Sequence, residues 1–220
     1  GLGIKNLKVA IHMENMMPLN HPIRFSTSLA NENLGGTKTL SVLFEGDILS
    51  PEIMQAMDWM EQELEKMPET GSVTSIASVT RIISRALNDP GDPFYDTIPN
   101  NREAIAQYIE FYNMSGDPED FEKLVNFEYS KAILNIQFKI HDISEFNKYE
   151  NRVRELVKGI PWCTLMAGQC LVEKGMSEAI VQGQIYSLIF AFAAIVLMLW
   201  FIFRSLMAGF YGSIALLASL

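Results

Sequence analysis

Cysteine and histidine are scarce in this chain of 220 residues, which contains two cysteines and three histidines. A domain of this size needs no disulfides. Cys163 and Cys170 stand seven positions apart and could form one disulfide in an oxidising compartment, but two buried apolar thiols are the favoured interpretation. His12, His21 and His141 have no further histidine or cysteine at ligand spacing, so no metal site is predicted.

Catalytic groupings are lacking too. Ser72, Ser75 and Ser78 recur at short spacing, but no Gly-x-Ser-x-Gly turn surrounds any of them, and no histidine has an evident catalytic partner. Two carboxylate pairs are predicted to cap backbone amides at helix starts: Asp47 with Glu52, and Glu119 with Asp120. The sequence therefore predicts no enzyme, no catalytic residue and no cofactor site.

Methionine, by contrast, occurs 12 times. Met13, Met16 and Met17 near His12 could bind a soft metal ion such as Cu(I), but methionine commonly fills irregular apolar surface, and that interpretation is favoured. Three further methionines stand at helical spacing and are predicted to face the core: Met54, Met57 and Met60.

Basic charge is also in short supply, with 17 Lys and Arg against 26 Asp and Glu. All 26 acidic residues but only 16 basic ones lie at or before Glu178, which gives this part a net charge of −10. Nucleic-acid binding needs clustered Lys and Arg, so that class is excluded. The apolar fraction of 49% lets roughly the first 178 residues form one ordinary globular domain.

Charge is missing altogether from Ala179 to Phe203, a run of 25 residues. A bilayer core needs about 20 apolar helical residues, so this run predicts a membrane helix. Arg204 and Ser205 precede a second apolar run, Leu206 to Leu220, interpreted as the start of another span. Because Gly1 is not an initiator and no signal peptide precedes the domain, we expect a piece of a larger multi-pass protein. Arg204 in a short loop favours the cytoplasmic side, which places residues 1–178 outside.

The first half of the domain predicts the order strand, helix, strand. Thr39 to Glu45 alternates as a half-buried strand does, and Ser72 to Ile76 is short and β-branched. Between them, Ser50 supplies a cap for a helix from about Pro51 to Lys66.

The second half repeats this order. Lys131 to Ile140 alternates clearly, Asp142 with Glu145 resembles a capping box for a helix that Gly159 ends, and Trp162 to Ala167 supplies a last strand. Two β-α-β units in series predict an α+β domain of the ferredoxin-like, split βαβ type.

A helical insertion, about Ser78 to Asn126, separates the two halves. Asn100 with Glu103, and Asp117 with Pro118, are predicted helix starts, and Asp89 to Pro99 is a predicted loop. Binding specificity usually resides in such insertions. The predicted organisation is a leader at 1–36, the domain at 37–170, an approach and membrane helix at 171–204, and a further span from 205 to 220.

The order of these parts resembles the RND (resistance-nodulation-division) superfamily, and within it the predicted exporters of hydrophobic or lipid-like molecules, the MMPL/Patched-like branch. The stretches that carry the resemblance are Gly35-Gly36, Leu40 to Phe44, Glu45-Gly46-Asp47-Ile48, Ser50-Pro51-Glu52, Ile98-Pro99, Ala106-Gln107-Tyr108, Ala167-Gly168 through Gln184 to Ser187, and Phe203-Arg204-Ser205. The resemblance covers nearly the whole chain, and no single motif in it is diagnostic.

The resemblance implies a porter domain on the outer side of a bacterial inner membrane, in a multi-pass protein that exports its substrate by proton antiport. The implied partners are the lipid bilayer, a hydrophobic or lipid-like small molecule and the remainder of the same chain, with a homo-oligomer also possible. The proton-relay acids of such proteins lie in a membrane helix, and Ala179 to Leu220 contains no Asp or Glu, so none can be assigned here. The residues of the substrate pathway are not named by the sequence.

Coupling to the membrane is expected through one stiff helix. Leu171 to Glu178 is amphipathic and leads into the membrane run, and Lys174 to Gln184 contains no proline. Two other classes stay open: a membrane-anchored ligand-binding or sensor domain, and the outer domain of an ABC-type permease. Roughly twelve spans with two large loops would favour the RND type, two spans a sensor, and four a permease.

Overall fold

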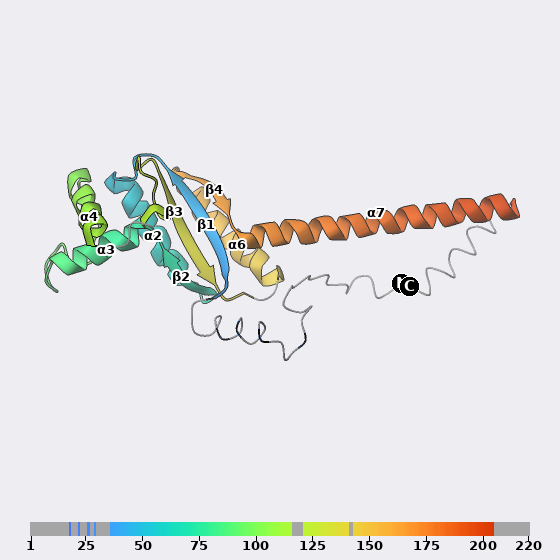
Figure 1. Ribbon diagram of the computed structural model, residues 1–220, viewed down its shortest axis with the longest axis horizontal. Coiled ribbons are helices and arrows are strands. Elements are labelled where there is room, and N and C mark those ends of the chain that lie inside the picture. The colour runs from blue at the N-terminus through green and yellow to red at the C-terminus, as the bar shows by residue number, and fades with distance from the viewer. Residues whose placement is uncertain are drawn as a thin grey trace. The chain divides into compact units, whose positions relative to one another are not determined.

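A four-stranded antiparallel sheet forms the centre of the domain (Figure 1). The computed structural model describes residues 36–115, 121–140 and 143–204, and isolated positions 18, 22, 26 and 29 before them. The elements are β1 (Lys38–Glu45), α2 (Pro51–Glu65), β2 (Thr70–Thr74), α3 (Ile76–Leu87), α4 (Arg102–Ser115), β3 (Lys131–Phe138), α6 (Ile143–Lys158), β4 (Cys163–Ala167) and α7 (Gln169–Phe203). The chain is thus an α+β protein, as the sequence predicts.

The two β-α-β halves share the sheet by interleaving their strands. The strand order is β2-β3-β1-β4, with β1 antiparallel to both β3 and β4, and β2 antiparallel to β3. The strand β3 therefore lies between β1 and β2, and β1 lies between β3 and β4. Each half holds one strand of the other half between its own two strands, so neither half has a complete sheet alone.

One face of this sheet is the core face, because apolar residues alternate along the two central strands. Leu40, Val42 and Phe44 in β1 are fully buried, and so are Leu134 and Ile136 in β3. These side chains lie in one hydrophobic cluster with residues of the covering helices. The alternation expected for both strands is confirmed.

The opposite face of the sheet is mixed in character. Ser41 in β1 donates a hydrogen bond to Asn135 in β3, with 2.7 Å between the oxygens. Two residues along the strand, Leu43 stands opposite Ile133 on one side and opposite Leu165 of β4 on the other. Polar cross-strand pairs and one apolar row thus alternate on this face.

Helix α2 covers the core face with its methionines. Ser50 is the cap, its hydroxyl oxygen accepting from the amide of Ile53, and Pro51 occupies the first helical position. The methionines predicted to face the core are fully buried there: Met54, Met57 and Met60. The helix ends at Glu65, one residue before the predicted end.

Helix α6 packs on the same face through aromatic side chains. Phe146 stacks on Phe138 of β3 with ring centroids 5.5 Å apart, and Tyr149 lies 5.2 Å from the same ring. The phenol of Tyr149 also shares a hydrogen bond of 2.8 Å with Thr70 of β2. The helix is confirmed, while the predicted capping residue Asp142 lies outside the described residues.

The predicted bounds of the second strand were wrong. This strand runs from Thr70 to Thr74, because Ser75 and Ser78 form a capping box that starts α3 at Ile76. The Ser75 hydroxyl accepts from the amide of Ala77 at 3.0 Å, and the Ser78 hydroxyl accepts from the amide of Ser75 at 3.0 Å. Helix caps thus override the β-branched pattern of this segment. Smaller differences occur elsewhere, since β3 ends at Phe138 and β4 begins at Cys163.

The predicted insertion is helical, but it belongs to the same core. The buried cluster includes Val79 of α3 and Ile105 and Ile109 of α4. Helix α4 begins at Arg102, capped by Asn101, whose side-chain oxygen accepts from the amide of Ala104 at 2.7 Å. The expected cap at Asn100 was therefore wrong by one residue, and the expected start at residues 117–118 lies outside the described residues.

A charged network fastens the loop of residues 89–99 to the helices. Arg81 of α3 forms two parallel hydrogen bonds to Asp96, of 3.0 and 2.8 Å, and a further ion pair of 3.2 Å to Asp58 of α2. Arg85 adds a contact of 3.0 Å to Asp96. The backbone of Asp96 is left-handed, with φ of 56°, a conformation that Asp tolerates better than most residues. The network joins α2, α3 and the loop.

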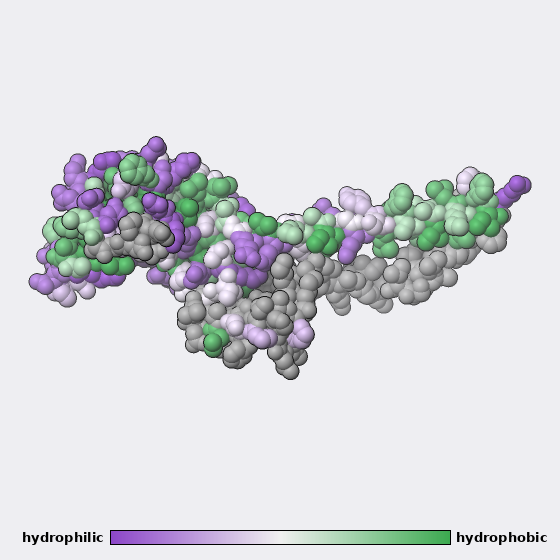
Figure 2. Space-filling view, in the orientation of Figure 1, coloured by the Kyte–Doolittle hydropathy of each residue, from purple (hydrophilic) through white to green (hydrophobic). Residues whose placement is uncertain are grey.

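Helix α7 is long, apolar and continuous from Gln169 to Phe203. Its C-terminal part is green in the hydropathy view (Figure 2), and large apolar side chains such as Phe190 and Phe201 are mostly exposed. By length and composition it is the one helix among the described residues that could cross a membrane. By contacts, the described chain divides into two compact units, one ending at Val172 and the other beginning at Glu173.

Candidate functional site

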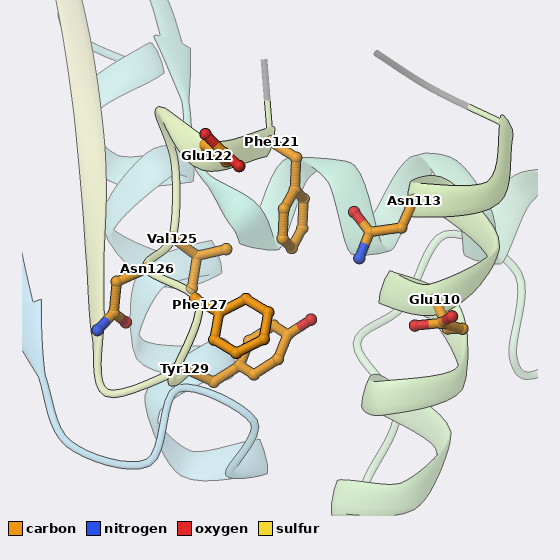
Figure 3. A pocket seen from close by; sticks show the side chains of 8 residues that line it. All are labelled: Glu110, Asn113, Phe121, Glu122, Val125, Asn126, Phe127 and Tyr129. Atoms are coloured by element: carbon orange, nitrogen blue, oxygen red, sulfur yellow. The ribbon is translucent and has the colours of Figure 1, made fainter. Parts of the chain in front are cut away.

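A cavity of about 600 Å³ lies between α4 and the segment of residues 121–130 (Figure 3). Most of its lining lies in the predicted insertion, residues 78–126, in which the sequence predicts binding specificity, while Phe127 and Tyr129 lie just beyond the predicted end. The rings of Phe121 and Tyr129 project into the space between the two walls, and α4 carries Glu110 and Asn113 on the other side. The lining residues are Glu110, Asn113, Phe121, Glu122, Val125, Asn126, Phe127 and Tyr129.

The side chain of Asn126 organises the turn that carries the aromatic wall. Its oxygen accepts from the amides of Ser130 and Lys131, at 2.9 and 2.8 Å, and its nitrogen donates to the Ser130 hydroxyl at 2.9 Å. All polar atoms of this amide are thus used inside the turn, and the side chain points away from the cavity in Figure 3. An isolated bridge between Val125 and Ala132 continues the pairing toward β3.

Tyr129 takes an unusual backbone conformation within this turn. Its φ is 53°, a left-handed value that is uncommon for a bulky residue and that persists only where neighbours fix it. Its amide donates to the carbonyl of Asn126 at 3.0 Å, and its carbonyl accepts from the amide of Ile48 at 2.9 Å. The first bond closes the turn and the second ties it to the segment that follows β1, while the Tyr129 ring lies on the side of the cavity in Figure 3.

Three aromatic residues of this wall differ in burial. Phe121 is buried and lies edge-on to Tyr129, with centroids 6.3 Å apart. Tyr129 is half-buried, whereas Phe127 is 98% exposed. A phenyl ring contributes to folding by burying its surface, so the exposed ring of Phe127 adds almost nothing to the core. Its apolar surface is available at the mouth of the cavity.

The opposite wall is a regular face of α4. Ile105 and Ile109 turn inward to the core, and the residues next to Ile109 on the helix surface, Glu110 and Asn113, reach the cavity. The start of α4 is held by an ion pair between Arg102 and Asp47, with 2.7 Å between the nearest atoms. Hydrogen bonding to Arg102 lowers the pKa of Asp47. The sequence assigned Asp47 to helix capping alone and missed this partner.

The electrostatics of the cavity are acidic. Its described lining contains two carboxylates, Glu110 and Glu122, and no Lys, Arg or His. No ion pair joins either carboxylate to another residue in the described part of the chain. Among its described residues the lining offers two carboxylates, two amides and aromatic rings, a set that can bind a ligand through charge, hydrogen bonds and apolar contact.

A second notable group is the buried carboxyl of Glu61 in α2, which is 4% exposed. Burial raises the pKa of Glu61 to about 7, although hydrogen bonds from Ser75 and Ser78 favour the charged form. The Ser78 hydroxyl lies 3.0 Å from a Glu61 oxygen and 2.8 Å from the Ser75 carbonyl oxygen, and its single hydrogen can serve one of them at a time. The ionised carboxylate is the stronger acceptor, so ionisation of Glu61 favours donation from Ser78 to Glu61.

The residues that the sequence weighed as possible ligands are not brought together. Both cysteines are free; Cys170 is buried as the favoured interpretation expects, whereas Cys163 is only half-buried. Burial raises the pKa of the Cys163 thiol to about 12. Among the described residues, no three His, Cys, Asp or Glu side chains are grouped to hold a metal ion. The methionines near His12, and the other two histidines, lie outside the described residues.

The aromatic cavity wall was missed by sequence reasoning, because no residue pattern in the insertion has a fixed ligand chemistry. One usable signal was Phe127, a large apolar residue between Asn126 and Glu128 in a segment without helical or strand periodicity. Compared with known proteins, the chain matches no family model and no curated protein. What the cavity binds is therefore inferred from the chemistry of its own walls.

Proposed function

We propose that this chain is the extracytoplasmic porter domain and following membrane helix of a proton-driven RND-type exporter of hydrophobic or lipid-like substrates. The observation that carries the proposal is the sheet order β2-β3-β1-β4, in which two β-α-β halves interleave around a helical insertion. This order supports the ferredoxin-like, split βαβ domain that the family resemblance implies. A fold alone hosts many functions, so the membrane helix and the cavity are needed as well.

Helix α7 supports the proposal as a mechanical element. It is helical without interruption from Lys174 to Gln184, the stretch in which the sequence predicts no break. A helix of 35 residues is about 52 Å long and is stiff over that length. In the proposed mechanism, proton movement elsewhere in the membrane part of the protein shifts this helix, and the shift opens and closes the substrate path in the domain.

The proposed setting is the bacterial inner membrane, with the domain on the outer side. In that setting the bilayer and the rest of the polypeptide are the partners of α7, and a hydrophobic small molecule is the partner of the domain. The cavity between α4 and residues 121–130 supports this role, because aromatic rings line it and provide apolar contact area for such a molecule.

The experiment that tests the proposal is transport by the full-length protein in inverted membrane vesicles. A fluorescent hydrophobic probe should enter the vesicles when a proton gradient is imposed, and an uncoupler should stop the uptake. Uptake that follows added ATP, with the proton gradient collapsed, would instead assign the domain to a permease with a separate ATPase. Probe binding without uptake under either energy source would assign it to a sensor.

A further inference from the structure

The acidic aromatic cavity has a more specific chemistry than a generic apolar pocket. Glu110 approaches from α4 and Glu122 from the facing segment, so negative charge is supplied by both walls. No basic residue is present in the described lining to neutralise it. An anionic ligand in this cavity would meet two like charges, whereas a cation would meet two opposite ones.

The aromatic rings add a second preference for positive charge. The face of a phenyl or phenol ring carries a negative quadrupole and attracts ammonium groups, including quaternary ones that have no hydrogen to donate. Phe127 offers nearly its whole surface, and Tyr129 is fixed beside it by the strained turn. The same rings provide apolar contact area for the body of the ligand.

A metal ion fits these walls poorly. The Asn126 amide is consumed by hydrogen bonds within its own turn, which leaves two carboxylates, the Asn113 amide and the Tyr129 phenol as side-chain oxygen donors. Hard cations such as Ca²⁺ need six to eight oxygen ligands. The Phe127 ring supplies no oxygen, and the aromatic faces of Phe127 and Tyr129 favour a polarisable organic ion instead.

We propose that this cavity binds organic cations with an apolar body, such as amphiphilic amines and quaternary ammonium compounds. The charged head lies between Glu110 and Glu122, and the apolar body lies against Phe127 and Tyr129. The inference deepens the proposed function by naming the substrate class, and it rests on that function only for the transport of the bound cation.

The test measures binding of three small probes to the chain in an uncharged detergent by isothermal titration calorimetry. The probes are benzyltrimethylammonium, neutral N-benzylacetamide and anionic phenylacetate, which share the benzyl group and differ in charge. Benzyltrimethylammonium should bind most tightly and more weakly at high salt, and phenylacetate should bind least. Equal binding of the cation and phenylacetate would overturn the proposal.

The variants are chosen at exposed positions so that the chain keeps its fold, which circular dichroism checks. The double variant E110Q/E122Q should weaken cation binding about tenfold. Phe127→Leu keeps the apolar volume but removes the ring face, and should weaken it roughly two- to fivefold. Glu128→Gln is the matched control, because Glu128 is exposed, adjacent to Phe127 and outside the lining. It should change binding less than about twofold.

The outcomes separate the cavity from the exporter. Cation binding that E110Q/E122Q leaves unchanged would overturn the cavity assignment, even if the full-length protein transports hydrophobic molecules down a proton gradient. Cation binding that follows the predicted order of variants would support the cavity assignment, even if no gradient-driven transport is found.

Discussion

The carboxyl of Glu61 makes stability depend on pH in the direction opposite to most acidic residues. Its pKa in the folded chain is about 7, against an ordinary value of 4.5, because the group is buried. Below pH 4.5 the carboxyl is neutral in both folded and unfolded chains. Between pH 4.5 and 7 the unfolded chain loses the proton first, so folding stability falls, and above pH 7 the full penalty remains.

The prediction at this residue is that Glu61→Gln stabilises the chain at pH 8 and not at pH 4. A glutamine has the shape of the protonated acid, so the variant should gain roughly 3 kcal/mol of unfolding free energy at pH 8, since one pKa unit is worth about 1.4 kcal/mol. Urea unfolding followed by circular dichroism measures the free energy of unfolding at pH 4 and at pH 8. Glu128→Gln, which is exposed and is not among the groups that shift the pKa of Glu61, is the control. A gain of the same size at pH 4 and pH 8 would show that burial does not shift the pKa of Glu61.

Arg81 is the residue on which the charged network between elements depends. Arg81→Met leaves Asp58 and Asp96 without their principal partner at positions that are largely shielded from water. We expect the free energy of unfolding to fall by about 1 to 2 kcal/mol, which lies between the values typical of exposed and buried ion pairs. The rate of amide hydrogen exchange in residues 89–99 should also rise in this variant, because the loop loses its two parallel hydrogen bonds to α3.

The matched control for Arg81 is Arg102→Met. The Arg102 pair with Asp47 has similar geometry, but both side chains are about half exposed. Water and salt screen such a pair, so its loss should lower the free energy of unfolding clearly less than the loss of Arg81 does. Equal losses for the two variants would mean that burial does not distinguish the two ion pairs.

At the scale of elements, α7 is predicted to transmit motion only while it stays helical. Gly175 lies in α7 before the apolar run, and no atom lies near the position of an added side chain. Gly175→Pro removes a backbone donor and clashes with the preceding turn, so it should break the helix and abolish gradient-driven transport by the full-length protein. Gly175→Ala should preserve transport, because alanine favours helix by about 1 kcal/mol over glycine. Normal transport by the proline variant, with membrane insertion confirmed, would contradict the coupling role of α7.

Most elements of the fold could be predicted because their signals are local. Period-two burial marks β1 and β3, and the cap at Ser50 with methionines at helical spacing marks α2. The second strand was misplaced because Ser75 fits a strand as well as a helix cap, and the capping box that it forms with Ser78 decides between them. Contacts distant in sequence, such as Arg102 with Asp47, have no local signal.

The candidate site could be predicted only as a region. The helical insertion suggested where specificity resides, but the cavity depends on two features that sequence periodicity does not reveal. One is the left-handed Tyr129, held by the amide of Ile48 from the turn that follows β1. The other is the proximity of Glu122 to α4. Both arise when segments separated in sequence pack together.

At the scale of the whole molecule, the insertion cannot be removed as a module. The buried cluster contains Val79, Ile105 and Ile109 from the insertion together with Phe44 and Leu134 from the sheet. Deletion of residues 78–126 would therefore open the core, and lost transport would report unfolding. Point variants in the cavity and in α7 therefore test the transport role better than this deletion does.

The proposed orientation predicts which side of the membrane an added thiol faces. Lys66, at the end of α2, has a side chain that is 67% exposed. Lys66→Cys should react with a membrane-impermeant maleimide in intact spheroplasts, because the domain is proposed to be extracytoplasmic. The unsubstituted chain should react little, since burial raises the pKa of Cys163 and encloses Cys170. Labelling that requires permeabilised cells would reverse the orientation.

Proton-coupled export is the central claim, and proton movement during transport tests it most directly. Full-length protein in inverted vesicles, with an imposed pH gradient read by a fluorescent dye, should dissipate that gradient faster when benzyltrimethylammonium or a longer-chain ammonium amphiphile is added. The account predicts acceleration that saturates with the cation and that E110Q/E122Q shifts to higher concentration. A rate of proton movement that no hydrophobic or cationic compound changes, in vesicles whose protein is folded and inserted, would contradict it.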